Sequence, residues 1–186
     1  MTQNRPMQPE LALRVATLAD REPIDELMKV SAAALFPSSY DARQTEGMVR
    51  YVSDVDEMLL ADGTYFVIEV DGEMVACGGW SRRNKLYTGS GDAAGDARLL
   101  DPASEPARVR AMFTHPDWTR RGLGRRILEA CEEAARREGY TKLALGATLP
   151  GLPLYLAYGF EAVEEFEVTM PDGVSVACMA MEKPIA

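Results

Sequence analysis

The chain has 186 residues and a formal net charge of -9, with 47% apolar and 26% charged side chains. This length and composition predict one globular domain covering residues 1–186, in which the polar segment 1–9 is a loose tail. A surface this acidic repels phosphate backbones and anionic lipid, so neither a nucleic acid nor a membrane is an expected partner. Without an apolar run of membrane-spanning length or an export signal, the expected compartment is the cytoplasm.

Three cysteines, Cys77, Cys131 and Cys178, lie far apart in the sequence. Their odd number and the lack of a C-x-x-C spacing argue against a disulfide framework or a zinc knuckle. We therefore expect small buried thiols and no metal site.

The N-terminal part begins with a strand and continues with helices. Apolar residues alternate at 11–15, which predicts a strand, and Thr17 or Asp20 could cap the helix that follows. The residues with helical spacing in that helix are Ile24, Leu27 and Met28. A second helical stretch is expected over much of 41–60.

A hairpin comes next. Strand-forming residues at 65–70 and 74–77 flank Asp71-Gly72, a two-residue turn of the I′ kind. The sequence Gly78-Gly79-Trp80 is expected to end or bend the second strand. Residues 84–106 are rich in Gly, Ala, Asp and Pro and lack periodicity, so we expect a long surface loop.

The C-terminal half alternates strands and helices and completes the sheet. Its expected elements are a strand at 108–113, an amphipathic helix from Leu123 that ends at Gly139, a strand at 143–145, a short helix holding Leu154 and Tyr155, and a hairpin of 166–170 and 174–181. The complete order is β-α-α-β-β-β-α-β-α-β-β. It predicts an α/β fold with a mixed sheet and helices on its faces.

The turn before the amphipathic helix breaks two local rules. Gly122 and Gly124 lie at the helix start, where glycine costs about 1 kcal/mol relative to alanine. Positive charge is also disfavoured at a helix N-terminus, yet four arginines gather there: Arg120, Arg121, Arg125 and Arg126. A bound polyanion would resolve both conflicts, because free N–H groups and arginines together bind phosphate oxygens.

The same turn is open to other interpretations. A solvated arginine cluster beside a flexible turn would account for the same residues. A dinucleotide fingerprint is excluded because Ile127 stands where its third glycine belongs, and no Gly-Lys-Ser/Thr sequence exists for a P-loop. The basic cluster is compact rather than a stripe, which disfavours nucleic acid.

A family resemblance enters with a second motif. His115-Pro116 precedes Gly122-Leu123-Gly124, and Leu154-Tyr155-Leu156-Ala157-Tyr158-Gly159-Phe160 follows at the proper separation. With these motifs, residues 108–160 resemble the GNAT superfamily of acetyl-CoA-dependent N-acetyltransferases, whereas the N-terminal half agrees only in element order. The resemblance implies a GNAT-like fold in which the fourth and fifth strands splay to admit the pantetheine arm.

The resemblance also assigns cofactor contacts. It implies acetyl-CoA binding by Met112, Phe113, Thr114, Thr119, Arg120, Arg121, Gly122, Leu123, Gly124, Arg125, Arg126 and Thr148. Backbone N–H groups near 112–114 would polarise the thioester carbonyl. Three positions depart from the family pattern: Thr119 replaces Arg or Gln, Thr148 replaces a common asparagine, and Leu154 replaces phenylalanine.

In the family register, Tyr155 is the residue that protonates the departing thiolate, although a packed aromatic would fit the same position. A phenol of pKa about 10 can protonate a thiolate of pKa about 8.5 only through a preformed short hydrogen bond. The general base is not evident. His115 is the only histidine and is better explained as a surface or turn-capping residue, so a water chain could serve instead.

The expected reaction is direct acetyl transfer to a primary amine of a small molecule or peptide. Two alternatives are an acyl-CoA-binding regulatory module without turnover and a transferase of a longer acyl group. Trp80 and the 84–106 loop could flank the acceptor, or they could be a core aromatic and a surface loop. A homodimer is also compatible with the sequence.

Overall fold

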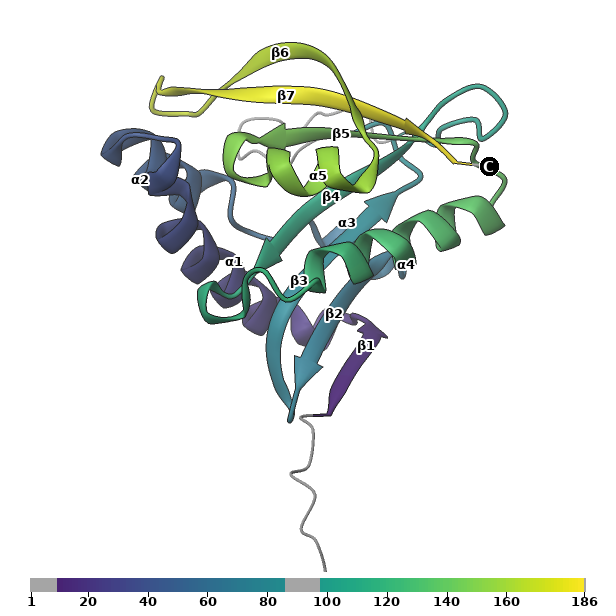
Figure 1. Ribbon diagram of the computed structural model, residues 1–186, viewed down its shortest axis with the longest axis horizontal. Helices are drawn as coiled ribbons and strands as arrows, with labels where there is room; N and C mark the ends of the chain where they lie inside the picture. Colours follow the sequence, from purple (N-terminus) through teal and green to yellow (C-terminus); the bar gives the residue numbers. More distant parts are fainter. Residues whose placement is uncertain (1–9, 86–97, 186) are drawn as a thin grey trace, which may run out of the picture.

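The computed structural model describes residues 10–85 and 98–185 (Figure 1). The expected tail at 1–9 and residues 86–97 of the expected loop lie outside this described part. The described strands form one seven-stranded sheet in the order β1-β2-β3-β4-β5-β7-β6. Their bounds are β1 Leu11–Val15, β2 Tyr65–Val70, β3 Glu73–Ser81, β4 Ala107–Thr114, β5 Lys142–Thr148, β6 Glu161–Thr169 and β7 Ser175–Pro184.

The helices are α1 Arg21–Leu35, α2 Ala42–Tyr51, α3 Glu57–Ala61, α4 Leu123–Arg137 and α5 Leu152–Tyr158. The predicted order is confirmed with one addition, because the stretch 41–60 divides into α2 and α3. Two capping aspartates explain the division. The Asp41 carboxylate accepts a hydrogen bond from the Gln44 N–H, and the Asp56 carboxylate accepts one from the Met58 N–H, so each begins its own helix.

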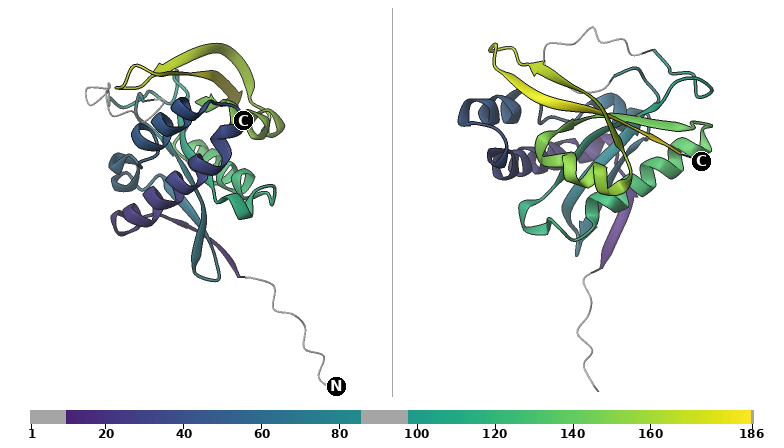
Figure 2. Two further views of the ribbon diagram at one scale, coloured as in Figure 1. Left: turned by 90° about the vertical axis from the view of Figure 1, so that its left-hand side faces the viewer. Right: turned by 45° about the horizontal axis from the view of Figure 1, so that its top comes forward.

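The helices cover both faces of the sheet, with α1 and α2 on one face and α4 and α5 on the other (Figure 2). The buried side of α4 carries Leu123, Ile127, Leu128, Cys131 and Ala135. Its exposed side carries the i,i+4 ion pairs Glu132–Arg136 and Glu133–Arg137, at 2.7 and 3.0 Å. Gly139 follows the helix with a φ of 90°, as expected of a residue that ends it.

The first hairpin has the predicted turn but a longer second strand. Asp71 and Gly72 both have positive φ, 51° and 85°, which a type I′ turn requires. The strand β3 does not end at Gly78-Gly79 but continues through Ser81. Glycine is needed at 79 for a close approach, since a Cβ there would lie 2.5 Å from the Thr64 carbonyl oxygen.

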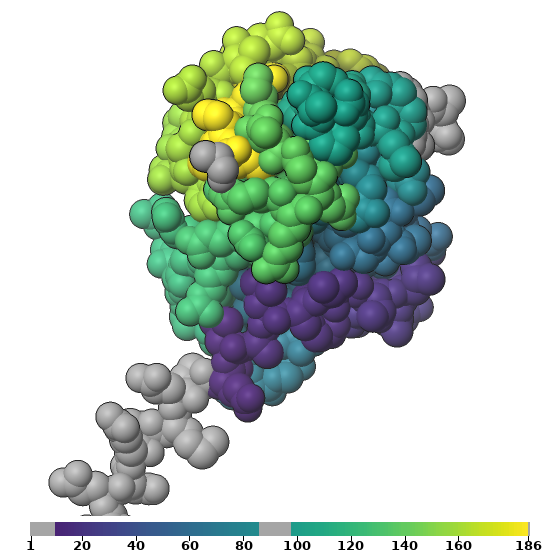
Figure 3. All heavy atoms as spheres, turned by 90° about the vertical axis from the view of Figure 1, so that its right-hand side faces the viewer, coloured from purple at the N-terminus to yellow at the C-terminus, as the bar shows by residue number. Residues whose placement is uncertain are grey.

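Trp80 is a core residue and not part of a binding surface. It is 1% exposed and meets Tyr140 edge-on, with ring centroids 5.9 Å apart. The chain after residue 97 returns to this core, where the Tyr140 hydroxyl donates to the Leu100 carbonyl oxygen at 3.2 Å. Figure 3 shows this teal segment lying beside the green end of α4. The idea that Trp80 flanks the acceptor is therefore wrong.

The three cysteines are buried and free, as expected. Within the described ranges, no helix combines the length and the apolar character that a membrane crossing demands.

Candidate active site

The site is built where two central strands separate. In the described chain, β4 and β5 run parallel and pair through two residue couples only, Ala107 with Leu143 and Arg108 with Ala144. Beyond these couples the strands diverge, whereas β5 keeps a continuous ladder with β7 from Lys142 to Thr148. The divergence leaves a gap in the sheet that an extended ligand could enter.

A β-bulge shapes the β4 side of this gap. The register of β3 against β4 shifts between Cys77 and Gly79, and Ala111 has a φ of 51°, which is rare for a residue with a side chain. Gly78 provides the room, because any side chain there would collide with Met112. The Tyr65 hydroxyl donates to the Ala111 carbonyl oxygen at 2.6 Å and holds the bulge in place. A bulge interrupts the ladder and turns backbone groups out of it.

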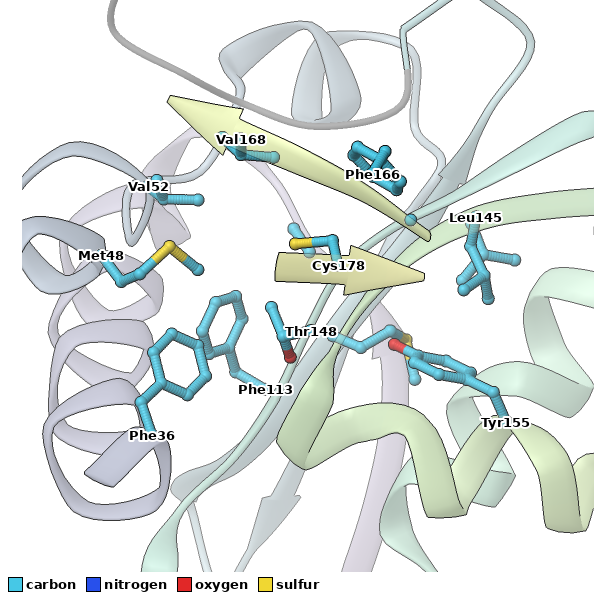
Figure 4. A pocket seen from close by; sticks show the side chains of 14 residues that line it. Phe36, Met48, Val52, Phe113, Leu145, Thr148, Tyr155, Phe166, Val168 and Cys178 are labelled. Atoms are coloured by element: carbon cyan, nitrogen blue, oxygen red, sulfur yellow. The ribbon is translucent and has the colours of Figure 1, made fainter. Parts of the chain in front are cut away.

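A pocket lies at the gap and extends toward α2 and the β6–β7 hairpin. Its lining residues are Phe36, Met48, Val52, Val109, Ala111, Met112, Phe113, Leu145, Gly146, Thr148, Tyr155, Phe166, Val168 and Cys178. Figure 4 shows Tyr155 on one side of this pocket and Phe36, Met48 and Val52 on the opposite side. The predicted residues Met112, Phe113, Thr148 and Tyr155 are therefore brought together around one cavity.

Tyr155 reaches the pocket from α5, and its hydroxyl points toward Thr148 (Figure 4). Its ring packs edge-on against Phe160, with centroids 5.8 Å apart, which fixes the direction of the side chain. Burial raises the pKa of the Tyr155 phenol well above its usual value. The group therefore carries its proton throughout the neutral range.

The turn before α4 has the features of an anion site. Gly122 is the N-cap of α4 with a φ of 78°, and Arg120 has a φ of 63°. Gly122 has no side chain to accept hydrogen bonds from the first-turn N–H groups, and that turn holds no acidic residue. These N–H groups can therefore bind an anion.

The four arginines differ in their surroundings. Arg121 lies over the Trp118 ring at 4.4 Å and donates to the Asp117 carbonyl oxygen, and Arg125 pairs with Glu129 at 3.1 Å. Arg120 and Arg126 are exposed and form no ion pair with any residue in the described ranges. These two are the arginines most available to a ligand.

Two residues of the predicted turn take part in the packing of the fold. Leu123 is 3% exposed and belongs to the core, so only its backbone can meet a ligand. Gly124 faces α5, and a Cβ there would lie 2.8 Å from Cδ2 of Leu154. The backbone of Gly124 therefore packs closely against α5, and its assignment to the cofactor site stays a prediction.

The remaining predicted residues have structural contacts as well. The Thr119 hydroxyl donates to the Pro116 carbonyl oxygen at 3.1 Å, and the Thr114 carbonyl oxygen accepts from the Ser31 hydroxyl at 2.7 Å. His115 caps the short turn after β4, because its Nδ1 accepts from the Asp117 N–H. The interpretation of this histidine as a turn cap is confirmed.

Sequence reasoning missed the apolar side of the pocket. Its residues come from the α1–α2 region and from the β6–β7 hairpin: Phe36, Met48, Val52, Phe166, Val168 and Cys178. Tyr40 joins these two regions, because its hydroxyl donates to the Ala177 carbonyl oxygen and accepts from the Leu149 N–H. No motif marks these positions, since each is an ordinary apolar residue in its own element.

The sequence identifies a protein family, and solved structures share the fold. The acetyltransferase (GNAT) domain model matches residues 61–162, so the chain belongs to the GNAT acetyltransferase family. A GCN5-related N-acetyltransferase from Rhodopseudomonas palustris shares the fold with a TM-score of 0.72 and 20% identity, over 96% of this chain and 98% of that one.

Two further solved structures carry the relevant ligand. The PaiA N-acetyltransferase from Thermoplasma acidophilum, in complex with coenzyme A, has a TM-score of 0.64 and 15% identity, over 94% of this chain and 99% of that one. YncA, a putative acetyltransferase from Salmonella typhimurium with acetyl-CoA, has a TM-score of 0.62 and 17% identity, over 95% of both chains. These relatives are consistent with acetyl-CoA as the cosubstrate.

The contact between Gly124 and Leu154 can be tested by stability measurements. Gly124→Val should lower the free energy of unfolding by about 1–3 kcal/mol, because the added side chain overpacks the contact between α4 and α5. Adding Leu154→Ala should recover part of this loss, so the two substitutions should be non-additive in a double-mutant cycle followed by chemical denaturation. Strict additivity would show that the two residues do not meet.

Proposed function

We propose that this protein transfers an acetyl group from acetyl-CoA directly to a primary amine of a small molecule or peptide. The observation that carries the proposal is the gap between β4 and β5, with a β-bulge on one side and the Tyr155 hydroxyl on the other. Family membership supports acyl transfer in general, and this arrangement supports the N-acetyl reaction in particular.

The residues of the turn and β4 fit acetyl-CoA. We assign the pyrophosphate to the free N–H groups that follow Gly122, with Arg120 and Arg126 neutralising its charge. The open space around Gly122, where an added Cβ would meet nothing within 4 Å, leaves room for this approach. When bound, acetyl-CoA supplies the acetyl thioester, and backbone N–H groups at 112–114 would polarise its carbonyl.

Direct transfer needs a proton donor and no protein nucleophile. The amine nitrogen bonds to the carbonyl carbon, the C–S bond breaks, and Tyr155 gives its proton to the departing sulfur. The proton lost by the amine returns to Tyr155 through water, so the products are an amide and coenzyme A. Cys178 is a poor nucleophile here, because burial raises the pKa of its thiol to about 11 and keeps it protonated.

Two other functions remain as alternatives. A regulatory module that binds acyl-CoA without turnover would have no use for a protonated phenol in the gap, so Tyr155 favours the enzyme. A transferase of longer acyl groups would use the apolar side of the pocket for its acyl chain. A thiol-release assay with acetyl-CoA, longer acyl-CoAs and an amine panel separates these functions.

The cofactor assignment predicts a charge effect. Arg120→Glu and Arg126→Glu should each weaken acetyl-CoA binding about tenfold or more, the scale of one lost charge-assisted hydrogen bond. Isothermal titration calorimetry would measure this, and wild-type affinity should fall as salt rises. The matched control is Arg137→Glu, which makes the same charge change at the exposed far end of α4. Equal affinities in all three variants would remove the assignment.

The mechanism predicts a rate effect at Tyr155. Tyr155→Phe keeps the ring and its contact with Phe160 but deletes the hydroxyl, so kcat should fall by roughly 10²-fold or more. Acetyl-CoA affinity should hardly change, because the proton is needed only as the thiolate leaves. Since burial raises the phenol pKa above its usual value of about 10, loss of this proton should not reduce wild-type kcat below pH 10.

Tyr158→Phe is the matched control. Tyr158 lies on the same helix, but its ring meets Arg125 and Lys183, and it is not among the residues that line the pocket. This variant should keep its kcat and lose only a little stability. A slow Tyr158→Phe beside a normal Tyr155→Phe would contradict the assigned roles, and two normal variants would mean that water supplies the proton.

A further inference from the structure

We propose, on the basis of the acetyltransferase function above, that the acceptor is a weakly basic amine attached to an apolar group. Its amino group would have a pKa well below that of a lysine side chain, and its apolar body would fill the side of the pocket opposite Tyr155. Polyamines and lysine side chains would be poor acceptors.

The lining of that side carries the first argument. It is made by η2, the 3-10 turn Phe36–Ser38, together with α2, β4 and the β6–β7 hairpin: Phe36, Met48, Val52, Phe113, Val168 and Cys178. The rings of Phe36 and Phe113 lie 6.3 Å apart and form an aromatic wall. A flat or branched apolar group would be complementary to such a surface.

The charge of the pocket carries the second argument. Among the residues that the structure describes, the pocket lining includes no Asp, Glu, Lys, Arg or His. Its two titratable groups, the Tyr155 phenol and the Cys178 thiol, are both kept neutral by burial, which raises their pKa values. An ammonium ion in this pocket would thus find no opposite charge among the described lining residues.

Charged residues on the neighbouring elements have partners or positions elsewhere. On α2, Arg50 lies over the Tyr51 ring and lines a separate surface pocket with Glu46. On β4, the buried Arg110 pairs with Asp56 at 3.3 Å. On β6, Glu165 and Glu167 are exposed, while Val168 lines the pocket. Among the residues with a described position, the overall acidity of the chain therefore does not extend into the acceptor side.

An uncharged pocket selects amines by their basicity. Burial without a counter-charge disfavours the ammonium form, so the amine must enter as its neutral, nucleophilic form. At pH 7.5 about 0.1% of an amine with the pKa of lysine is neutral, against about one third of an α-amino group with pKa near 7.8. The pocket would thus reduce the need for a carboxylate or histidine base, and the sequence makes no such base evident.

Four amines separate the two requirements. Phenylalanine amide is weakly basic and has an apolar body, and glycine amide is weakly basic but lacks one. Phenethylamine is strongly basic and has an apolar body, and putrescine is strongly basic and lacks one. With acetyl-CoA at pH 7.5, thiol release should give phenylalanine amide a kcat/KM at least tenfold above glycine amide and phenethylamine. The value for phenethylamine should rise about tenfold per pH unit between pH 7 and 9, following its neutral fraction.

Matched variants test the location. Val168→Glu places a carboxylate in the lining, whereas Val163→Glu makes the same change on the same strand at a residue that is 60% exposed. Val168→Glu should lose at least tenfold in kcat/KM for phenylalanine amide and gain relative activity with putrescine, and Val163→Glu should match wild type. Val52→Phe fills the pocket from a half-buried position and should also lower kcat/KM for phenylalanine amide. This second variant keeps the test decisive if Val168→Glu folds poorly.

Several outcomes would overturn the inference. Putrescine or an Nα-blocked lysine amide as the best acceptor of wild type would disprove it while leaving acetyl transfer intact. A longer acyl-CoA that outperforms acetyl-CoA with glycine amide would show that the apolar side holds the acyl chain. If no amine releases coenzyme A although acetyl-CoA binds, the proposed function itself fails, and the inference fails with it.

Discussion

The separation of β4 from β5 is the feature on which the rest of the site depends. Two parallel strands that pair only at Ala107 and Arg108 leave backbone groups without ladder partners along most of their facing edges. Each strand compensates on its other side, where β4 pairs with β3 and β5 pairs with β7. The sheet therefore consists of two bonded halves joined at one end, and the open end can take an extended ligand as though it were another strand.

Packing across the gap keeps the two halves at a fixed separation. One apolar cluster joins the helical N-terminal region to the last hairpin, and its buried members are Ala32, Phe36, Tyr40, Met48, Val168, Met170, Val176 and Cys178. The Tyr40 hydroxyl adds hydrogen bonds to Ala177 on β7 and to Leu149 after β5. Because this cluster bridges the gap, the same residues that support the hairpin also form the apolar wall of the pocket.

Local patterns predicted the elements well because periodicity and turn chemistry act within a few residues. The amphipathic α4, the Asp71-Gly72 turn and the closing Gly139 all follow from such rules. The pocket could not be predicted in the same way. Tyr40 and Ala177, for example, are 137 positions apart, and a single sequence offers no signal for that distance. The packing of Gly124 against Leu154 has no local signal for the same reason, since Leu154 belongs to another helix.

Charge is divided along the site in a way that matches the proposed chemistry. At the turn before α4, Arg120, Arg126 and free N–H groups offer positive potential to an anionic group. In the gap, burial keeps Tyr155 and Cys178 neutral, so the proposed acid retains its proton and the thiol would not compete with an amine. A cosubstrate that is anionic at one end and neutral at its reactive end would fit this gradient in one direction only. The uncharged lining would then favour acceptors of low basicity, because the amine must also bind in its neutral form.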